Sequence, residues 1–104
     1  MRQGMQVKIF KARDINLLKT DLQNLCNEGV QINKVKFETF GDSRKLLVYF
    51  TENALTKKQE VVVLKKTITG TINHLNNELS TNVACLDTVP FDTNGLMAIV
   101  IKNV

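Results

Sequence analysis

The sequence predicts an α+β fold made of two βαββ units in tandem, with mainly antiparallel sheet or sheets and two helices packed on one face. Three observations predict it. Each half of the chain begins with a short stretch rich in apolar residues, Val7-Lys8-Ile9-Phe10 in the first half and four consecutive apolar residues at 61–64 in the second. A stripe of apolar residues at helical spacing follows each run. Two strand-like stretches separated by turn residues follow each stripe, so the order strand, helix, strand, strand occurs twice.

The first unit is expected to run from residue 5 to residue 50. Residues 5–10 are predicted to form a strand, and a helix is expected over 14–28. Asp14 suits the N-cap because its carboxylate can accept from free amides of the first turn, and Gly29 suits a left-handed C-cap. Residues 31–50 alternate around a turn at 41–43, which predicts a hairpin. The apolar stripe of the helix consists of Ile15, Leu18, Leu22, Leu25 and Cys26.

The second unit is expected to run from residue 60 to residue 102. Residues 60–65 contain four consecutive apolar residues, three of them β-branched, which predicts a strand buried on both faces. Thr67 or Thr69 can cap the helix that follows. Residues 83–91 and 96–101 are predicted to form a second hairpin, because Asn94-Gly95 lies between them. The stripe of this helix consists of Ile68, Ile72, Leu75 and Leu79.

A chain of 104 residues is long enough for one domain with its own core. We therefore expect a single compact domain, 1–104, in which a polar linker at 51–59 joins the two pseudo-repeats. Two arrangements stay open. The units can join edge to edge into one sheet, or they can pack as two small lobes. Either arrangement, or pairing with a second copy, would cover sheet edges that one unit leaves open. A monomer and a homodimer are both compatible with the sequence.

Composition points to the cytoplasm. No apolar run approaches the roughly 20 residues of a membrane span, and no apolar signal-peptide segment follows the N-terminus. Cys26 and Cys85 have no metal-binding spacing and are expected to be free thiols. The net charge is +4, and residues 1–58 carry eleven Lys and Arg against six Asp and Glu. The first half is therefore the basic half.

Residues suited to catalysis are scarce. His74 is the only histidine, and it lies off the helical stripe among asparagines, where a solvated side chain is expected. Ser43 and Ser80 have no histidine at a spacing typical of nucleophilic catalysis. The five glycines are isolated, so no phosphate-cradling loop is predicted. The sequence predicts no catalytic, cofactor or metal site, and hence a protein that is not an enzyme.

Nucleic-acid binding is the second function class that the sequence supports. Four lysines of the first unit can share the solvent face of its sheet, with Phe10 or Tyr49 among them, as in stacking platforms. The alternative is that lysines on exposed strand positions only keep the face soluble. These candidate nucleic-acid-binding residues are Lys8, Lys34, Lys36 and Lys45.

Protein binding is the function class that the sequence supports first. The second hairpin is apolar on both faces, and alternate side chains of a strand cannot reach one core. Phe91 and Met97 flank its turn, where an exposed aromatic beside a methionine suits an interface anchor. The alternative is that both pack over the end of the second helix. The candidate partner-binding residues are Phe91, Leu96 and Met97.

Two resemblances add to this interpretation. Residues 5–10, a helix ending near Gly29 and residues 34–37 resemble a family of small sporulation-associated proteins of Gram-positive bacteria, which implies only a compact βαββ unit. Lysine outnumbers arginine eleven to three, as is common in AT-rich genomes of low-GC bacteria and their phages. The length, this composition and the doubled βαββ plan resemble a type of small staphylococcal phage protein that shuts down host replication by binding the helicase loader DnaI, an AAA+ ATPase.

The second resemblance implies a function without chemistry. A phage-encoded inhibitor of this kind covers a surface that the host ATPase needs for self-assembly or for single-strand binding, and it acts in the host cytoplasm. The predicted partner is a host helicase-loader ATPase, and no cofactor is implied.

Overall fold

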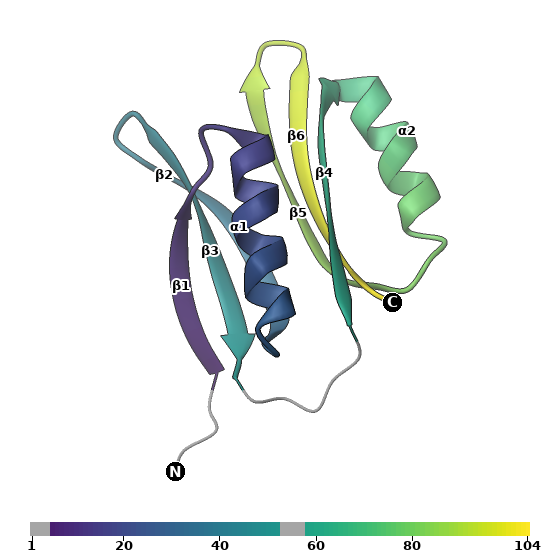
Figure 1. Ribbon diagram of the computed structural model, residues 1–104. Helices are drawn as coiled ribbons and strands as arrows, with labels where there is room; N and C mark the ends of the chain where they lie inside the picture. The colour runs from purple at the N-terminus through teal and green to yellow at the C-terminus, as the bar shows by residue number, and fades with distance from the viewer. Residues whose placement is uncertain (1–4, 53–57) are drawn as a thin grey trace.

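The computed structural model describes residues 5–52 and 58–104 (Figure 1). The elements follow the predicted order twice over. They are β1 (Met5–Lys11), α1 (Ile15–Asn27), β2 (Gln31–Phe40), β3 (Ser43–Thr51), β4 (Gln59–Thr67), α2 (Ile68–Glu78), β5 (Val83–Asp92) and β6 (Gly95–Asn103). The predicted linker 51–59 overlaps the ends of β3 and β4, and its residues 53–57 lie outside the described part of the chain.

The strands form two three-stranded antiparallel sheets, which confirms the α+β class. Sheet one has the order β1-β3-β2, and sheet two has the equivalent order β4-β6-β5. In each unit the last strand is central, because it pairs with the strand before the helix and with its hairpin partner. The units therefore form two sheets rather than one hydrogen-bonded sheet.

Both helices begin at the side chains that the sequence indicates. Asp14 accepts hydrogen bonds from the amides of Asn16 and Leu17, at 3.0 and 3.2 Å. Thr67 accepts from the amide of Gly70 at 3.2 Å. Gly29 has a φ of 84°, the left-handed conformation that ends α1 and turns the chain into β2. These local signals fix where each helix begins and where α1 ends.

The second hairpin is apolar on both faces because it borders two cores. Met97, Ile99 and Ile101 of β6 are at most 1% exposed and belong to a core that α1 and sheet one share. Ala98 and Val100 are fully buried in a smaller core, together with Leu64 of β4 and Leu75 of α2. The strand with both faces most completely buried is thus β6.

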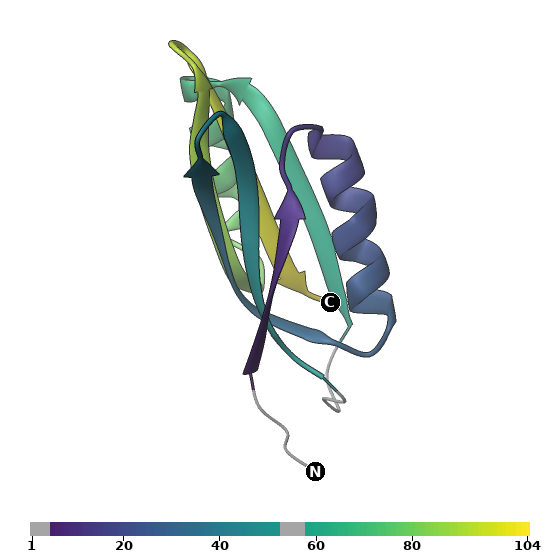
Figure 2. The same ribbon diagram turned by 90° about the vertical axis from the view of Figure 1, so that its left-hand side faces the viewer.

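The helices lie on opposite faces of sheet two, which corrects the expectation that they share one face (Figure 2). The reason is that α1 packs between the sheets, against its own sheet and against the inner face of sheet two. The opposite face of sheet two is then the one left for α2.

The apolar stripe predicted for α2 is largely exposed. Ile68, Ile72 and Leu79 are 40, 45 and 55% exposed, and only Leu75 of the stripe is buried. The helix instead turns Thr71 toward the sheet, where its hydroxyl donates to the carbonyl oxygen of Leu96 at 2.7 Å. This hydrogen bond satisfies a buried hydroxyl and sets the rotation of α2.

Polar side chains join the two units at their strand edges. The Gln59 side chain accepts from the amide of Ile32 at 2.8 Å and donates to the Ile32 carbonyl oxygen at 3.1 Å, in the manner of a neighbouring strand. Gln23 of α1 does the same for β4, because it donates to the Gln59 carbonyl oxygen and accepts from the amide of Val61. Asp87 of β5 accepts from the amide of Phe37 at 2.7 Å. Backbone groups at the junction are thereby paired without a continuous ladder.

Candidate functional site

The outer face of sheet one is the surface that faces away from α1. On β3, Leu46, Val48 and Phe50 are at most 5% exposed and belong to the core with α1. Side chains alternate along a strand, so the residues between them point outward. The register places Val7 opposite Tyr49 and Ile9 opposite Leu47. We define the outer face by the residues Met5, Val7, Ile9, Lys11, Lys34, Lys36, Glu38, Lys45, Leu47 and Tyr49.

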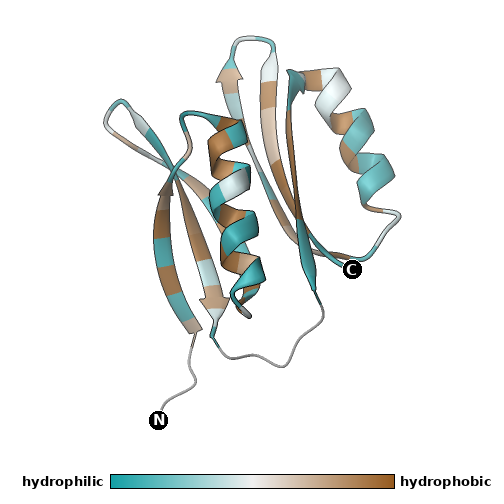
Figure 3. Cartoon of the chain, in the orientation of Figure 1, coloured by the Kyte–Doolittle hydropathy of each residue, from teal (hydrophilic) through white to brown (hydrophobic). Residues whose placement is uncertain are grey.

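The β1 part of this face is apolar and exposed. Met5, Val7 and Ile9 are 63, 55 and 51% exposed, and the alternation of hydropathy along β1 is visible in Figure 3. An antiparallel sheet with one covered face normally presents polar residues on the other. Three large apolar side chains in a row are therefore unexpected on this side, and such a patch is typical of a binding surface.

The outer edge of β1 adds backbone groups to the apolar row. Within the described residues, β1 pairs with β3 alone, so its second edge faces solvent. An edge of this kind can accept a strand from another chain. The nearest side-chain contact at its start is the hydrogen bond from Gln6 to Glu52, at 3.1 Å.

Three of the four candidate nucleic-acid-binding lysines share the outer face. The Lys34 ammonium lies 5.5 Å from the centre of the Tyr49 ring, as a cation–π contact requires. Lys36 forms an ion pair with Glu38 at 2.9 Å, and hydrogen bonding to Glu38 raises the pKa of Lys36. Lys45 faces Glu38 across the β2–β3 pair. These residues form a basic margin beside the apolar row of β1.

Lys8 lies on the opposite face of sheet one. It pairs with the buried Val48, and its ammonium lies 5.4 Å from the centre of the Phe10 ring. Both residues line a shallow pocket of about 290 Å³ beside the acidic side chains Asp21 and Glu28. Tyr49 therefore lies among the lysines of the outer face, and Phe10 does not.

The structure corrects the exposed position predicted for Met97. Met97 is 1% exposed, because it belongs to the core that residues of the first unit form against this face of sheet two. Leu96 is half-buried beside Thr71, since its carbonyl oxygen accepts from that hydroxyl. Neither the predicted exposure nor the alternative position over α2 describes Met97.

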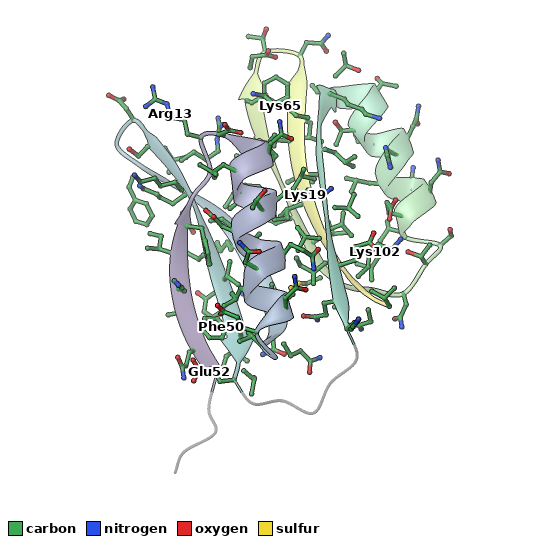
Figure 4. The ribbon with its side chains drawn as sticks, viewed as in Figure 1. Arg13, Lys19, Phe50, Glu52, Lys65 and Lys102 are labelled. Atoms are coloured by element: carbon green, nitrogen blue, oxygen red, sulfur yellow. The ribbon has the colours of Figure 1, made fainter. Side chains whose placement is uncertain are left out.

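Phe91 is half-buried and packs on its own hairpin. Its ring lies directly over Gly95, where an added Cβ would collide with it. The ammonium of Lys65, a residue of β4 that Figure 4 labels, lies 5.1 Å from the centre of the Phe91 ring. The ring is therefore held at the hairpin turn, and it is not a projecting anchor.

His74 and the turn residue Asp92 have structural contacts. His74 lies 3.1 Å from the Lys66 ammonium and 3.4 Å from Glu78, which also pairs with Lys102 at 3.1 Å. Asp92 accepts from the amide of Asn94 within the turn. In residues 5–52 and 58–104, no group of three His, Cys, Asp or Glu residues is arranged to hold a metal ion. No helix of the same residues is long and apolar enough to cross a membrane.

Both cysteines are free thiols with raised pKa values, and they come from different units. Burial raises the pKa of Cys26 to about 11. Burial also raises the pKa of Cys85 to about 11, with a smaller contribution from the charge of Cys26, and a hydrogen bond with the Val35 backbone opposes it. Both thiols therefore stay protonated near neutral pH, so they are poor nucleophiles.

Sequence reasoning missed the apolar row on β1. The signal is present, because Met5, Val7 and Ile9 occupy alternate positions and Gln6 and Lys8 separate them. Alternation of this kind normally marks the buried face of a strand. Only the structure shows that the row points away from α1.

Comparisons with protein-family profiles, curated proteins and solved structures find no match to this chain.

Proposed function

We propose that this chain is a phage-encoded, non-enzymatic inhibitor that binds a host replication ATPase of the helicase-loader class and thereby arrests host DNA replication. The exposed apolar row Met5, Val7 and Ile9 on the open edge of sheet one carries the proposal. It provides a binding surface that needs no chemistry. The choice of an AAA+ helicase loader rests on the whole-chain resemblance to small phage proteins that stop host replication.

The outer face has the make-up of a protein interface. Burying a Met, Val or Ile side chain contributes about 1.5–3 kcal/mol, so the row can supply the apolar centre of a contact. The open edge of β1 can add main-chain hydrogen bonds to a partner strand. The neighbouring lysines Lys34, Lys36 and Lys45 favour a partner whose matching surface is acidic at its rim.

Inhibition then follows from occlusion. An AAA+ ATPase works as an assembly, and a small rigid protein bound at a surface used for assembly or for single-strand binding blocks that use. The side-chain hydrogen bonds between the two units support this mechanism, because they give the chain a pre-organised shape and so lower the entropic cost of binding.

The test is light scattering on a size-exclusion column, with the protein alone and mixed with the purified ATPase domain of a staphylococcal helicase loader. We expect a stable complex for the natural chain. Val7→Asp or Ile9→Asp should abolish it, because each places a charge within the apolar row. Ile72→Asp on α2 is the matched control, since Ile72 is also about half exposed. Separate peaks for the natural chain discard this partner, and equal losses in all three variants discard the β1 surface.

Nucleic-acid binding is the second candidate, and the position of Tyr49 on one face with Lys34, Lys36 and Lys45 favours it. A base stacked on Tyr49 would displace the Lys34 ammonium from the ring and would lie beside all three lysines. This candidate predicts an affinity for single-stranded DNA that falls steeply as salt concentration rises. Fluorescence anisotropy with a labelled oligonucleotide measures it, and the absence of binding at low salt removes the candidate.

A further inference from the structure

A basic pocket of about 480 Å³ lies at the end of sheet one, next to the β2–β3 turn. Figure 4 labels Arg13 at this position, between the turn and the start of α1. The pocket is separate from the apolar row of β1, although both use strands of the same sheet. Its lining residues are Lys11, Arg13, Asp42, Ser43, Arg44 and Lys45.

Backbone contacts hold the pocket in a fixed shape. The amide of Ala12 donates to the carbonyl oxygen of Arg44 at 3.1 Å, which ties the loop before α1 to the start of β3. Ala12 itself is fully buried. On the other side, Gly41 has a φ of 62° and lets the β2–β3 turn close tightly. The two walls are therefore pre-organised by the fold.

The charges in the pocket are unbalanced. Four cationic side chains line it, against the single carboxylate of Asp42. No acidic group in residues 5–52 and 58–104 lies within 4.0 Å of any of the four cations. Lys11 and Lys45 are also directly opposite each other in the β1–β3 pair, and like charges in that position repel. A bound anion would relieve this repulsion.

We propose that this pocket binds a phosphate group. Two guanidinium groups and two ammonium groups line the pocket, and a phosphate has more negative charge and more acceptor oxygens to pair with them than a carboxylate has. Arg44 donates to the Pro90 carbonyl oxygen at 3.2 Å, which orients its guanidinium and leaves other N–H groups for a ligand. The site requires no protein target, so it holds or fails apart from the proposed inhibition. The phosphate can belong to a nucleotide or to the backbone of a nucleic acid.

The first experiment is an NMR titration of backbone amides with inorganic phosphate at constant ionic strength, with acetate as the comparison anion. We expect saturable shifts confined to residues 11–13 and 42–45 for phosphate, and none of that kind for acetate. Shifts that spread over lysines of both units, that do not saturate, or that acetate reproduces would overturn the proposal.

Variants make the site specific. Arg13→Ser and Lys11→Ser should each weaken phosphate binding about tenfold, because each removes a charged donor. Both side chains are exposed, so the fold should survive, and circular dichroism checks this. Lys19→Ser on α1 is the matched control, with the same change of charge at an exposed position outside the pocket (Figure 4). Equal weakening in the control would mean general attraction to a basic protein and would refute the site.

Two further probes identify the source of the phosphate. A nucleoside triphosphate and a single-stranded oligonucleotide of roughly 12 residues are titrated into the natural chain and into Arg13→Ser. Tighter binding of the oligonucleotide, lost in Arg13→Ser, assigns the pocket to a nucleic-acid backbone. Binding of the triphosphate without the oligonucleotide assigns it to a free nucleotide. If neither probe binds and inorganic phosphate does not bind either, the proposed phosphate site is refuted. That result would not affect the proposal that the apolar row of β1 binds a protein partner.

Discussion

The two helices have similar sequence patterns and different degrees of burial. All four core positions of α1, Ile15, Leu18, Leu22 and Leu25, are at most 8% exposed. In α2 only Thr71 and Leu75 are buried. The helices differ because α1 lies between two sheets and contacts both, whereas α2 lies on the outer side of one sheet. Helical periodicity therefore identifies an apolar stripe, but the arrangement of the units decides how much of that stripe is covered.

The two sheets differ in the same way. Sheet two has a helix on each face, and its central strand β6 is apolar from Leu96 to Ile101. Sheet one has α1 on one face, and its outer face carries the exposed row of β1. The unit that supplies the shared helix is thus the unit whose own sheet stays half covered. This asymmetry is why two similar βαββ units present different surfaces to solvent.

The largest expected effect separates the two helices. Leu18→Ala should lower the free energy of unfolding by about 2–5 kcal/mol, because it opens a cavity between the sheets. Ile72→Ala, at an exposed position of α2, should change it by less than about 0.5 kcal/mol. Urea denaturation followed by circular dichroism measures both values. A similar loss in the two variants would mean that α1 and α2 are covered equally.

The second effect tests whether side chains join the units. Gln59→Leu removes the partner of the Ile32 amide and carbonyl, and both groups lie at a buried residue. The expected loss of stability is about 2–3 kcal/mol, since unsatisfied buried polar groups are costly. Gln6→Leu is the control, because Gln6 is exposed and contacts only Glu52 among its described side-chain partners. Equal stability of the two variants would show that the Gln59 contact is not needed.

The sequence predicts much of this fold because its signals are local. Asp14 and Thr67 cap helices, Gly29 ends one, and Asn94-Gly95 closes a hairpin, all from the chemistry of neighbouring residues. The arrangement of the units depends on contacts between distant residues. Gln59 and Ile32 are one example, and no pattern of spacing identifies them as partners. The α+β class was therefore predictable, whereas the opposite placement of the helices was not.

The candidate site was harder to predict for the same reason. The sequence predicts an exposed Met97, because one unit has a single helix and a hairpin with two apolar faces. The first unit supplies the missing cover, so Met97 is buried. Conversely, Met5, Val7 and Ile9 have the pattern of a buried face and are exposed. Each assignment needed the position of α1 relative to both sheets.

The third effect compares the thiols of the two units. Since burial raises the pKa of Cys26 and of Cys85 to about 11 from 9.0, the folded chain should react with a thiol reagent at pH 8 at least about tenfold more slowly than the unfolded chain. Between pH 9 and 11 the folded state keeps protons that the unfolded state loses, so stability should fall as pH rises through this window. Labelling rates of Cys26→Ser and Cys85→Ser measure each thiol separately. Fast labelling of one thiol would show that its unit is open.

The smallest effect compares two glycines, one in each unit. Gly29→Ala should cost about 1 kcal/mol, because a residue with a Cβ is strained at a φ of 84°. Gly70→Ala lies in the first turn of α2, where alanine favours the helix by roughly 0.5–1 kcal/mol. Its Cβ would lie 3.1 Å from the Thr67 hydroxyl, which caps that helix, and this close contact offsets part of the gain. We therefore expect a change near zero for Gly70→Ala and a clear loss for Gly29→Ala in thermal unfolding. A loss of similar size at Gly70 would mean that disturbing the Thr67 cap costs more stability than the alanine gains from helix propensity. The cap would then control the start of α2.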